Sequence, residues 1–187
     1  MQKRTEKTAR FTRSYRRLHK WVAVPLFLFM FIIGGTGVLL GWKKQMELRP
    51  GTQKGISTKA EEWLPLEQIH RAATAAADSL HWNNHIDRID VRPGKGIAKI
   101  IFDKHYSELQ IDLTNGKVLS TGKRYSDLIE HIHDGTIIDR LIGSKEQVKT
   151  IYTTLTSIGL MLLSFSGFWL WLNPKRMRRI KNQSLRV

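Results

Sequence analysis

Two long uncharged runs divide the chain, and basic clusters border both of them. Residues 21–42 and 150–172 contain no Asp, Glu, Lys or Arg. Both runs exceed the roughly 18–20 apolar residues that a helix needs to cross a hydrocarbon core of about 30 Å. The pattern predicts two transmembrane helices over these ranges. Trp21 and Trp42 bracket the first run, as interfacial aromatics do, and Pro25 is expected in the first turns of its helix.

Two other interpretations of these runs are less favoured. Buried core helices of a soluble protein carry a polar face, which these runs lack. A cleaved signal peptide has an apolar region of about 7–15 residues followed by a small-residue cleavage site. The first run is longer, and no such site follows in "GWKKQMELRP". We therefore interpret the first run as an uncleaved signal anchor.

The charge distribution predicts an orientation. The 187 residues carry a formal net charge of +15, and nearly all of it lies in the basic tails 1–20 and 173–187. A basic protein of this kind could bind nucleic acid, but cations confined to the flanks of apolar runs fit the positive-inside rule instead. We expect both tails in the cytoplasm of a bacterium, both helices in its inner membrane, and residues 43–149 outside. The absence of cysteine excludes disulfides, thiol catalysis and iron–sulfur clusters.

The middle of the chain predicts an α+β module over residues 63–125. Residues 43–62 carry Pro and Gly without apolar periodicity and are expected to form a linker. Apolar residues at helical spacing predict a helix over residues 65–80. Three alternating segments follow, and "TNGK" at 114–117 favours a hairpin with a two-residue type I′ turn, with a returning strand over 117–125. The expected fold is one helix on a small antiparallel sheet.

An amphipathic juxtamembrane segment, residues 126–149, connects this module to the second apolar run. In "YSDLIEHIHD" the pattern predicts a helix that begins with Ser126 as its N-cap and ends at Gly135. The following "GTIIDRLIGSKEQ" leads back toward the membrane.

These segments resemble a known family. "PLEQIHRAA", the paired strands and "IDLTNGKVLS" resemble the PepSY domain. "RRLHKWVAVPLFLFMFIIGGTGVLLGW" and "IEHIHDGTIIDRLIG…LLSFSGFWLWL" resemble the PepSY-associated transmembrane family, over roughly residues 13–173. Relatives often carry four spans and include iron-uptake-associated membrane reductases thought to bind b-type haem. This chain has two spans, so a complete reductase would need a second copy or a partner.

His19 is the first candidate cofactor residue. It stands where the basic tail meets the apolar run, and an imidazole at the edge of a span can ligate haem iron. Arg16 lies on the same helical side and could contact a haem propionate. The alternative is a histidine that rests at the polar interface without a ligand. The family resemblance brings the two interpretations to near parity.

His131 and His133 are the second group of candidates. They are two residues apart on a predicted helix, so they point to nearly opposite faces and cannot chelate one ion together. Helical spacing instead pairs Glu130 with His133 or Asp134, and Asp127 with His131, so that a carboxylate could orient a haem or metal ligand. An ordinary solvated helix face is the alternative. The family pattern matches His133, in "IHDG", as a haem-binding residue, whereas His131, Glu130 and Asp134 form a weaker candidate metal set.

One iron cannot bind both His19 and His133. They lie at opposite edges of a span, whose ends are separated by roughly 33 Å. A bis-histidine haem therefore needs two protomers or a partner's ligand. Gly37 and Gly41 form a GxxxG step that could support association, although such small residues could equally pack within one chain.

The sequence therefore favours an accessory membrane protein of the haem or iron redox type, acting as a homo-oligomer or in a larger membrane complex. No hydrolase motif or nucleotide-binding motif is present, and we expect at most a partial reductase component. The alternative is a cofactor-free regulatory or structural module that restrains a protease or belongs to an envelope complex. Its docking strand would be the sheet edge at residues 117–125.

Overall fold

The computed structural model describes residues 2–184, with side chains described for residues 12–173. The chain forms two compact units. The helical unit contains the residues up to Thr36 together with those from Ile132 onward. The sheet unit contains Gly37–His131.

The helical unit is built on two long helices, α1 (Gln2–Gly41) and α5 (Gln147–Ser184). They contain two candidate membrane spans, Thr12–Gly41 and Gln147–Asn173, each with an apolar part long enough to cross a membrane. Both stretches expose large apolar side chains, including Phe27 at 72% and Phe165 at 74%. Helices that are apolar all round and exposed need a lipid environment. The prediction of two spans over 21–42 and 150–172 is therefore supported, and each helix extends beyond its uncharged run.

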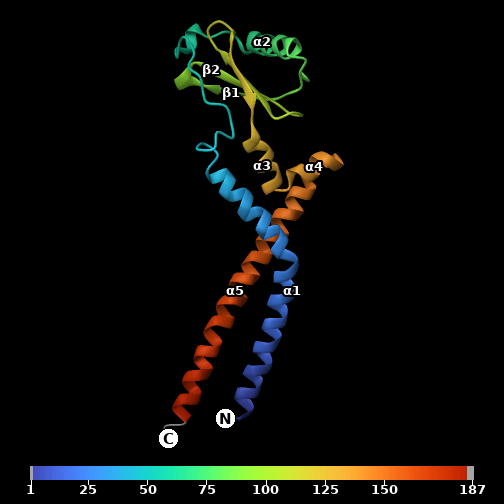
Figure 1. Ribbon diagram of the computed structural model, residues 1–187, viewed down its shortest axis with the longest axis vertical. Helices are drawn as coiled ribbons and strands as arrows, with labels where there is room; N and C mark the ends of the chain where they lie inside the picture. The colour runs from blue at the N-terminus through green and yellow to red at the C-terminus, as the bar shows by residue number, and fades with distance from the viewer. Residues whose placement is uncertain (1, 185–187) are drawn as a thin grey trace. The chain divides into compact units, whose positions relative to one another are not determined.

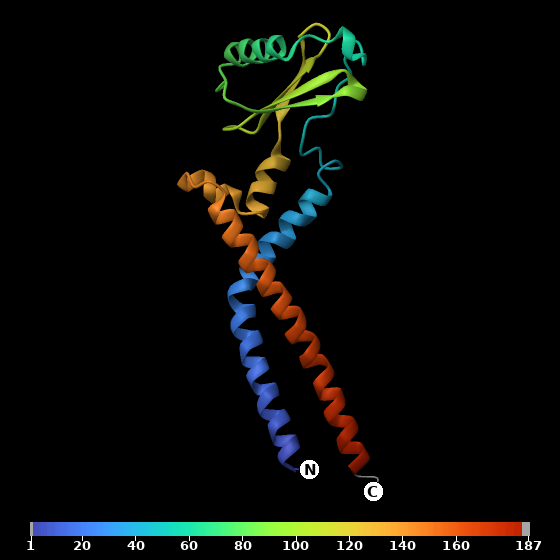
Figure 2. The same ribbon diagram turned by 180° about the vertical axis from the view of Figure 1, so that it is seen from behind.

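The two helices cross, and the start of α1 and the end of α5 lie at the same end of the helical unit (Figures 1 and 2). Leu26 packs at Gly159, where an added Cβ would lie 2.1 Å from the Leu26 Cδ1 atom. Gly159 therefore serves close packing within the chain. At Gly34, by contrast, an added Cβ would meet no atom within 4 Å. Gly159 thus lies at a contact within the chain, whereas Gly34 faces open space.

The expected position of Pro25 in its helix is wrong. α1 begins at Gln2, so Pro25 lies deep inside the helix rather than in its first turns. An interior proline removes one backbone hydrogen bond. Membrane helices tolerate this when neighbouring groups or helices compensate.

The sheet unit contains a four-stranded antiparallel sheet in the order β1-β2-β3-β4. The strands are β1 (Ile86–Arg92), β2 (Ile97–Phe102), β3 (Ser107–Asp112) and β4 (Val118–Lys123). Helix α2 (Leu66–Ser79) covers one face (Figure 1). Its buried Ile69, Ala73 and Ala77 pack against residues of β2 and β3. The predicted helix-on-sheet module is confirmed. The chain is an α+β membrane protein with two candidate spans flanking the sheet.

Strand β2 turns Ala98, Ile100 and Phe102 toward the core cluster with α2, and Ile97 and Ile101 alternate with them. All six residues of β2 are buried, so both faces of this strand are covered. A strand buried on both sides lacks the alternation that reveals its orientation.

The second face of the sheet is covered by the segment that was predicted to be a linker. Gln110 binds this segment from both sides: its Nε2 donates to the Gly51 carbonyl at 2.8 Å, and its Oε1 accepts from the Gln53 amide at 2.7 Å. Asp112 accepts from the Ile56 amide at 2.9 Å. Buried polar side chains of β3 therefore hold residues 51–57 against the sheet through hydrogen bonds.

The expected type I′ turn at Asn115-Gly116 is wrong. Gly116 has φ +73°, but Asn115 does not, and a type I′ turn needs both. The loop between β3 and β4 spans residues 113–117. Leu113 is buried, and its carbonyl accepts from the Leu64 amide at 2.7 Å. Because Leu113 is held in the core, the chain turns over more residues than the local Asn-Gly signal requires.

The segment after the sheet forms two short helices, α3 (Tyr125–His133) and α4 (Thr136–Ile142). α3 begins before Ser126, so Ser126 is not its N-cap; its hydroxyl donates to Asp127 at 3.0 Å. α3 ends at His133, just before Gly135, which has φ +82°. The predicted end of this helix at Gly135 is confirmed. α4 was not predicted, because a segment of seven residues is too short to establish a helical period.

Candidate functional site

His19 lies on α1 and meets α5 at Ser166. Its Nδ1 atom is 2.7 Å from the Ser166 Oγ. Gly167 is adjacent, and an added Cβ there would lie 3.7 Å from the His19 Cε1. The segments "LHKW" and "SGFWLW", which are far apart in the sequence, thus meet at this histidine. We call this arrangement the His19 site.

The Ser166 hydroxyl favours one tautomer of His19. Ser166 is placed to donate its single proton to the Leu162 carbonyl at 2.6 Å, as serines often do one turn back along a helix. With the proton directed there, the Ser166 oxygen accepts from His19. This arrangement favours the neutral tautomer with its proton on Nδ1 and its lone pair on Nε2. The structure gives Nε2 no hydrogen-bond partner among residues 12–173.

His133 ends α3 and meets α1 at Thr36 in the same way. Its Nδ1 atom lies 2.8 Å from the Thr36 Oγ1. Thr36 donates its proton to the Ile32 carbonyl at 2.6 Å. This arrangement favours the tautomer in which His133 donates from Nδ1, which leaves the Nε2 lone pair for a ligand. The segments "TG" and "IHDG" meet at this second arrangement, which we call the His133 site.

The two residues after His133 fix its turn to the start of α5. Asp134 accepts from the Thr136 amide at 3.0 Å and pairs with Lys149 at 3.0 Å. Burial alone would raise the pKa of Asp134, but the bonds from Thr136 and the pair with Lys149 lower it below its ordinary value. Gly135 lies against the Tyr152 ring, where an added Cβ would be 3.0 Å from a ring carbon. His133, Asp134 and Gly135 thus contact Thr36, Lys149 and Tyr152, respectively.

The His19 and His133 sites are far apart along α1. From His19 to Thr36 the helix rises by about 25 Å. This separation agrees with the inference that one iron cannot bind both histidines. Arg16 lies exposed about one turn before His19, on the side that the sequence predicted.

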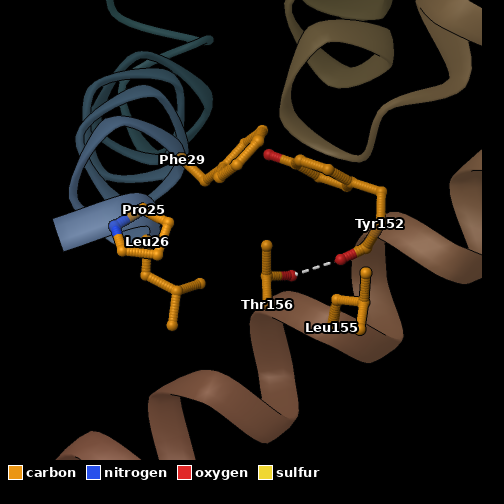
Figure 3. A pocket seen from close by; sticks show the side chains of 6 residues that line it. All are labelled: Pro25, Leu26, Phe29, Tyr152, Leu155 and Thr156. Atoms are coloured by element: carbon orange, nitrogen blue, oxygen red, sulfur yellow. Dashed lines mark hydrogen bonds between the residues drawn. The ribbon is translucent and has the colours of Figure 1, made fainter. Parts of the chain in front are cut away.

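A small apolar pocket lies between the helices at an intermediate level. It has a volume of about 230 Å³ and is lined by residues of α1 and α5 (Figure 3): Pro25, Leu26, Phe29, Tyr152, Leu155 and Thr156. The Phe29 and Tyr152 rings meet edge to face across it, with centroids 5.7 Å apart. Pockets for drug-sized ligands are larger, about 300–1,000 Å³, so this one is no cofactor chamber by itself.

The candidate metal set, His131, Glu130 and Asp134, is not gathered into one cluster. The His131 Nδ1 lies 3.0 Å from the Tyr106 hydroxyl, Glu130 is exposed, and Asp134 is paired with Lys149. Within residues 12–173 no group of three or more potential ligands is placed to hold an ion. A metal at these residues stays a prediction without geometric support.

Asp127 pairs with Arg124, whose Nε donates to it at 2.6 Å. Arg124 also contacts the fully buried Glu108, which accepts from Lys99 at 3.0 Å. Burial alone would lower the pKa of Arg124, but its bonds with Asp127 and Glu108 raise it above its ordinary value. This buried network joins β2, β3 and the start of α3.

Sequence reasoning identified the two histidines but not their partners. Ser166 and Thr36 stood inside the quoted segments "SG" and "TG", which was the available signal. Nothing in the sequence, however, indicated which histidine each hydroxyl meets. Lys149 and Tyr152 were also missed, because their roles arise only when α5 begins beside the turn at Gly135.

The fold and these two sites define a membrane protein in which an α+β module is inserted between two apolar helices. One family model, described as the PepSY-associated TM region, matches residues 16–186. The chain belongs to this family, which confirms the resemblance seen in the sequence. No curated protein gives a significant match to it.

Proposed function

We propose that the protein binds b-type haem and serves as a haem- or iron-related redox component, associated with iron uptake, in a bacterial inner membrane. One observation carries the proposal: the Nδ1 atoms of His19 and His133 each lie within hydrogen-bond distance of a helical hydroxyl that also has a backbone carbonyl of its own helix within reach. Ligating histidines characteristically donate their second ring N–H to a neighbouring acceptor, which fixes the tautomer and orients the ring. Both imidazoles are therefore prepared to ligate iron through Nε2.

Each histidine would hold a separate haem, because the two sites lie far apart on α1. The second axial ligand of each would come from another copy of the chain or from a partner protein. Arg16, exposed beside His19, would contact a propionate. When bound, haem supplies one-electron chemistry. The chain itself orients the two imidazoles through Ser166 and Thr36.

The proposed topology places both tails in the cytoplasm and the sheet unit outside. The basic tails support it through the positive-inside rule. It is also consistent with the start of α1 and the end of α5 lying at one end of the helical unit (Figure 2). Reporter fusions to either terminus should be active only in the cytoplasm. An exported terminus would contradict the assignment of both histidines to their leaflets.

The visible spectrum of the detergent-purified protein tests haem binding. With ample haem supply, we expect a Soret band and an α-band that sharpens on reduction. His19→Ala and His133→Ala should each remove a part of the absorbance. His70→Ala, an exposed histidine on α2, is the matched control and should leave the spectrum unchanged. A colourless protein would refute the proposal.

A second candidate function is a cofactor-free regulatory or structural module, and the edges of the sheet favour it. The β1 edge is protected by charges (Asp87, Arg88, Asp90 and Arg92), as edge strands often are. The β4 edge instead exposes Val118 and Leu119 and could accept an extended peptide. Here Leu119→Lys or deletion of residues 56–125 should abolish the cellular phenotype, while the histidine substitutions remain silent.

A further inference from the structure

Helix α4 exposes an apolar face that nothing in its own unit covers. Ile138, Leu141 and Ile142 are spaced at i, i+3 and i+4, so they lie on one side of the helix. Leu141 is 81% exposed and Ile142 is 70% exposed. Leu141 is more exposed than any other large apolar side chain in the described part of the chain. Its exposure exceeds even that of residues inside the two spans.

The opposite side of α4 is fixed to the first turn of α5 by Asp139. This carboxylate is buried, with 3% of its surface exposed, and accepts from the Val148 amide at 3.0 Å and the Lys149 amide at 2.8 Å. It also accepts from the Ser144 hydroxyl. Burial alone would raise the pKa of Asp139, but these hydrogen bonds lower it below its ordinary value. Asp139 thus caps α5 where the partial charge of the helix favours an anion.

This attachment places α4 beside the start of a candidate membrane span. The candidate span in α5 begins at Gln147, and the Asp139 carboxylate contacts the next two residues. When α5 crosses a bilayer from this point, a helix held there lies near the boundary between the hydrocarbon core and the headgroups. Exposed apolar side chains at that boundary can reach the acyl chains.

We propose that α4 is an interfacial helix whose Ile138, Leu141 and Ile142 insert into the membrane leaflet at the start of α5. The partner is therefore the lipid acyl chain region and not a protein. Three side chains form a face far smaller than the roughly 800 Å² per partner of a stable protein interface. An interfacial helix buries its apolar face about 5–10 Å into the boundary between headgroups and acyl chains, a depth that these three side chains can reach. This inference does not depend on haem binding.

Single-cysteine labelling of the full chain tests the proposal, because the native sequence has no cysteine. A nitroxide is attached at Leu141→Cys or Ile142→Cys, and the protein is reconstituted into phosphatidylcholine–phosphatidylglycerol vesicles. Collisions of the label with oxygen and with a water-soluble nickel chelate report its depth. We expect oxygen to dominate at both positions and also at the reference position Leu155→Cys in α5, where Leu155 is 64% exposed.

Leu66→Cys is the matched control outside the membrane, since Leu66 on α2 is 62% exposed. There the nickel chelate should dominate. A second measurement uses a membrane-impermeant maleimide, which should label Leu141→Cys several-fold more slowly than Leu66→Cys. All these side chains are exposed, so the substitutions should not disturb packing. If the positions in α4 react and collide as Leu66→Cys does, the helix is in water or on a protein and the proposal is overturned.

Discussion

The Nδ1 atom of His19 and the Oγ atom of Ser166 lie 2.7 Å apart, although 147 positions separate the two residues in the chain. The same relationship recurs between His133 and Thr36. In each case a helical hydroxyl lies within hydrogen-bond distance of a backbone carbonyl of its own helix and of the histidine. The repetition at two distant points favours the same tautomer for both imidazoles.

Removing the hydroxyl at the His19 site should weaken haem binding without removing the ligand. Ser166→Ala should lower haem affinity about 10–100-fold, the usual cost of losing a partner behind a ligand. Haem titration followed at the Soret band measures this. Ser164→Ala is the control, because Ser164 is exposed and donates only to the Leu160 carbonyl. An unchanged affinity in Ser166→Ala would contradict the role of Ser166.

The tautomer itself can be measured without haem. Nitrogen chemical shifts of His19 in the haem-free protein should show a proton on Nδ1, and Ser166→Ala should shift the population toward the other tautomer. Because this measurement does not depend on the cofactor, it separates an error in the local geometry from an error in the proposed function. A His19 protonated mainly on Nε2 in the unsubstituted protein would contradict the argument.

Gly159 should be required for the contact between α1 and α5. Gly159→Ala places a Cβ 2.1 Å from the Leu26 Cδ1, so Leu26 must move. Overpacking of this kind costs about 1–3 kcal/mol. Thermal unfolding in detergent should show the loss, and the second substitution Leu26→Ala should recover part of it. Gly34→Ala, in open space, should be neutral or slightly stabilising.

Gly135→Ala should be more harmful than Gly143→Ala. Both glycines have positive φ, +82° and +75°. An alanine at either position is therefore strained by the left-handed backbone, which destabilises the protein by about 1–2 kcal/mol. Only at Gly135 would the new Cβ also press on the Tyr152 ring. Unfolding measurements on both variants separate backbone strain from the contact. Equal losses would indicate that the Tyr152 contact is unimportant.

The sheet unit should lose stability in acid through Asp127. Burial alone would raise the pKa of Asp127, but its bonds and charge interaction with Arg124 lower it below its ordinary value. A carboxylate with a depressed folded-state pKa stabilises the fold above its unfolded-state pKa of about 3.9, and this stability is lost as pH falls through the folded-state pKa. Hydrogen exchange of β2 and β3 across this range measures the loss. Asp127→Asn should be less stable at neutral pH and should flatten the dependence.

Arg124→Met tests the same buried network by removing the cation that pairs with Asp127 and Glu108. It leaves Glu108 buried with Lys99 and Gln110 but without its guanidinium partner. Removing one partner of a buried ion pair costs about 3–5 kcal/mol. The same hydrogen-exchange measurement should show faster exchange in β3. Arg71→Met, which breaks an exposed pair with Glu67 on α2, is the control and should change stability by less than about 1 kcal/mol.

The sequence by itself determined the features that depend on local composition. Uncharged runs of sufficient length fixed the two spans, and helical spacing from Leu66 onward fixed α2. Alternation fixed the strands, and the segments "LHKW" and "IHDG" identified His19 and His133. Each of these signals is written in consecutive residues, because hydrophobic periodicity and chain length act locally.

Only the tertiary structure decided which distant residues meet. The Asn-Gly signal gave the wrong turn because Leu113 is held in the core by Leu64, and the segment called a linker is bound by Gln110 and Asp112. The pairing of Ser166 with His19 depends on where α1 and α5 cross. A hydroxyl in a helix looks the same in sequence whether it faces lipid or an imidazole. Contacts of this kind are set by packing between elements, which no local pattern records.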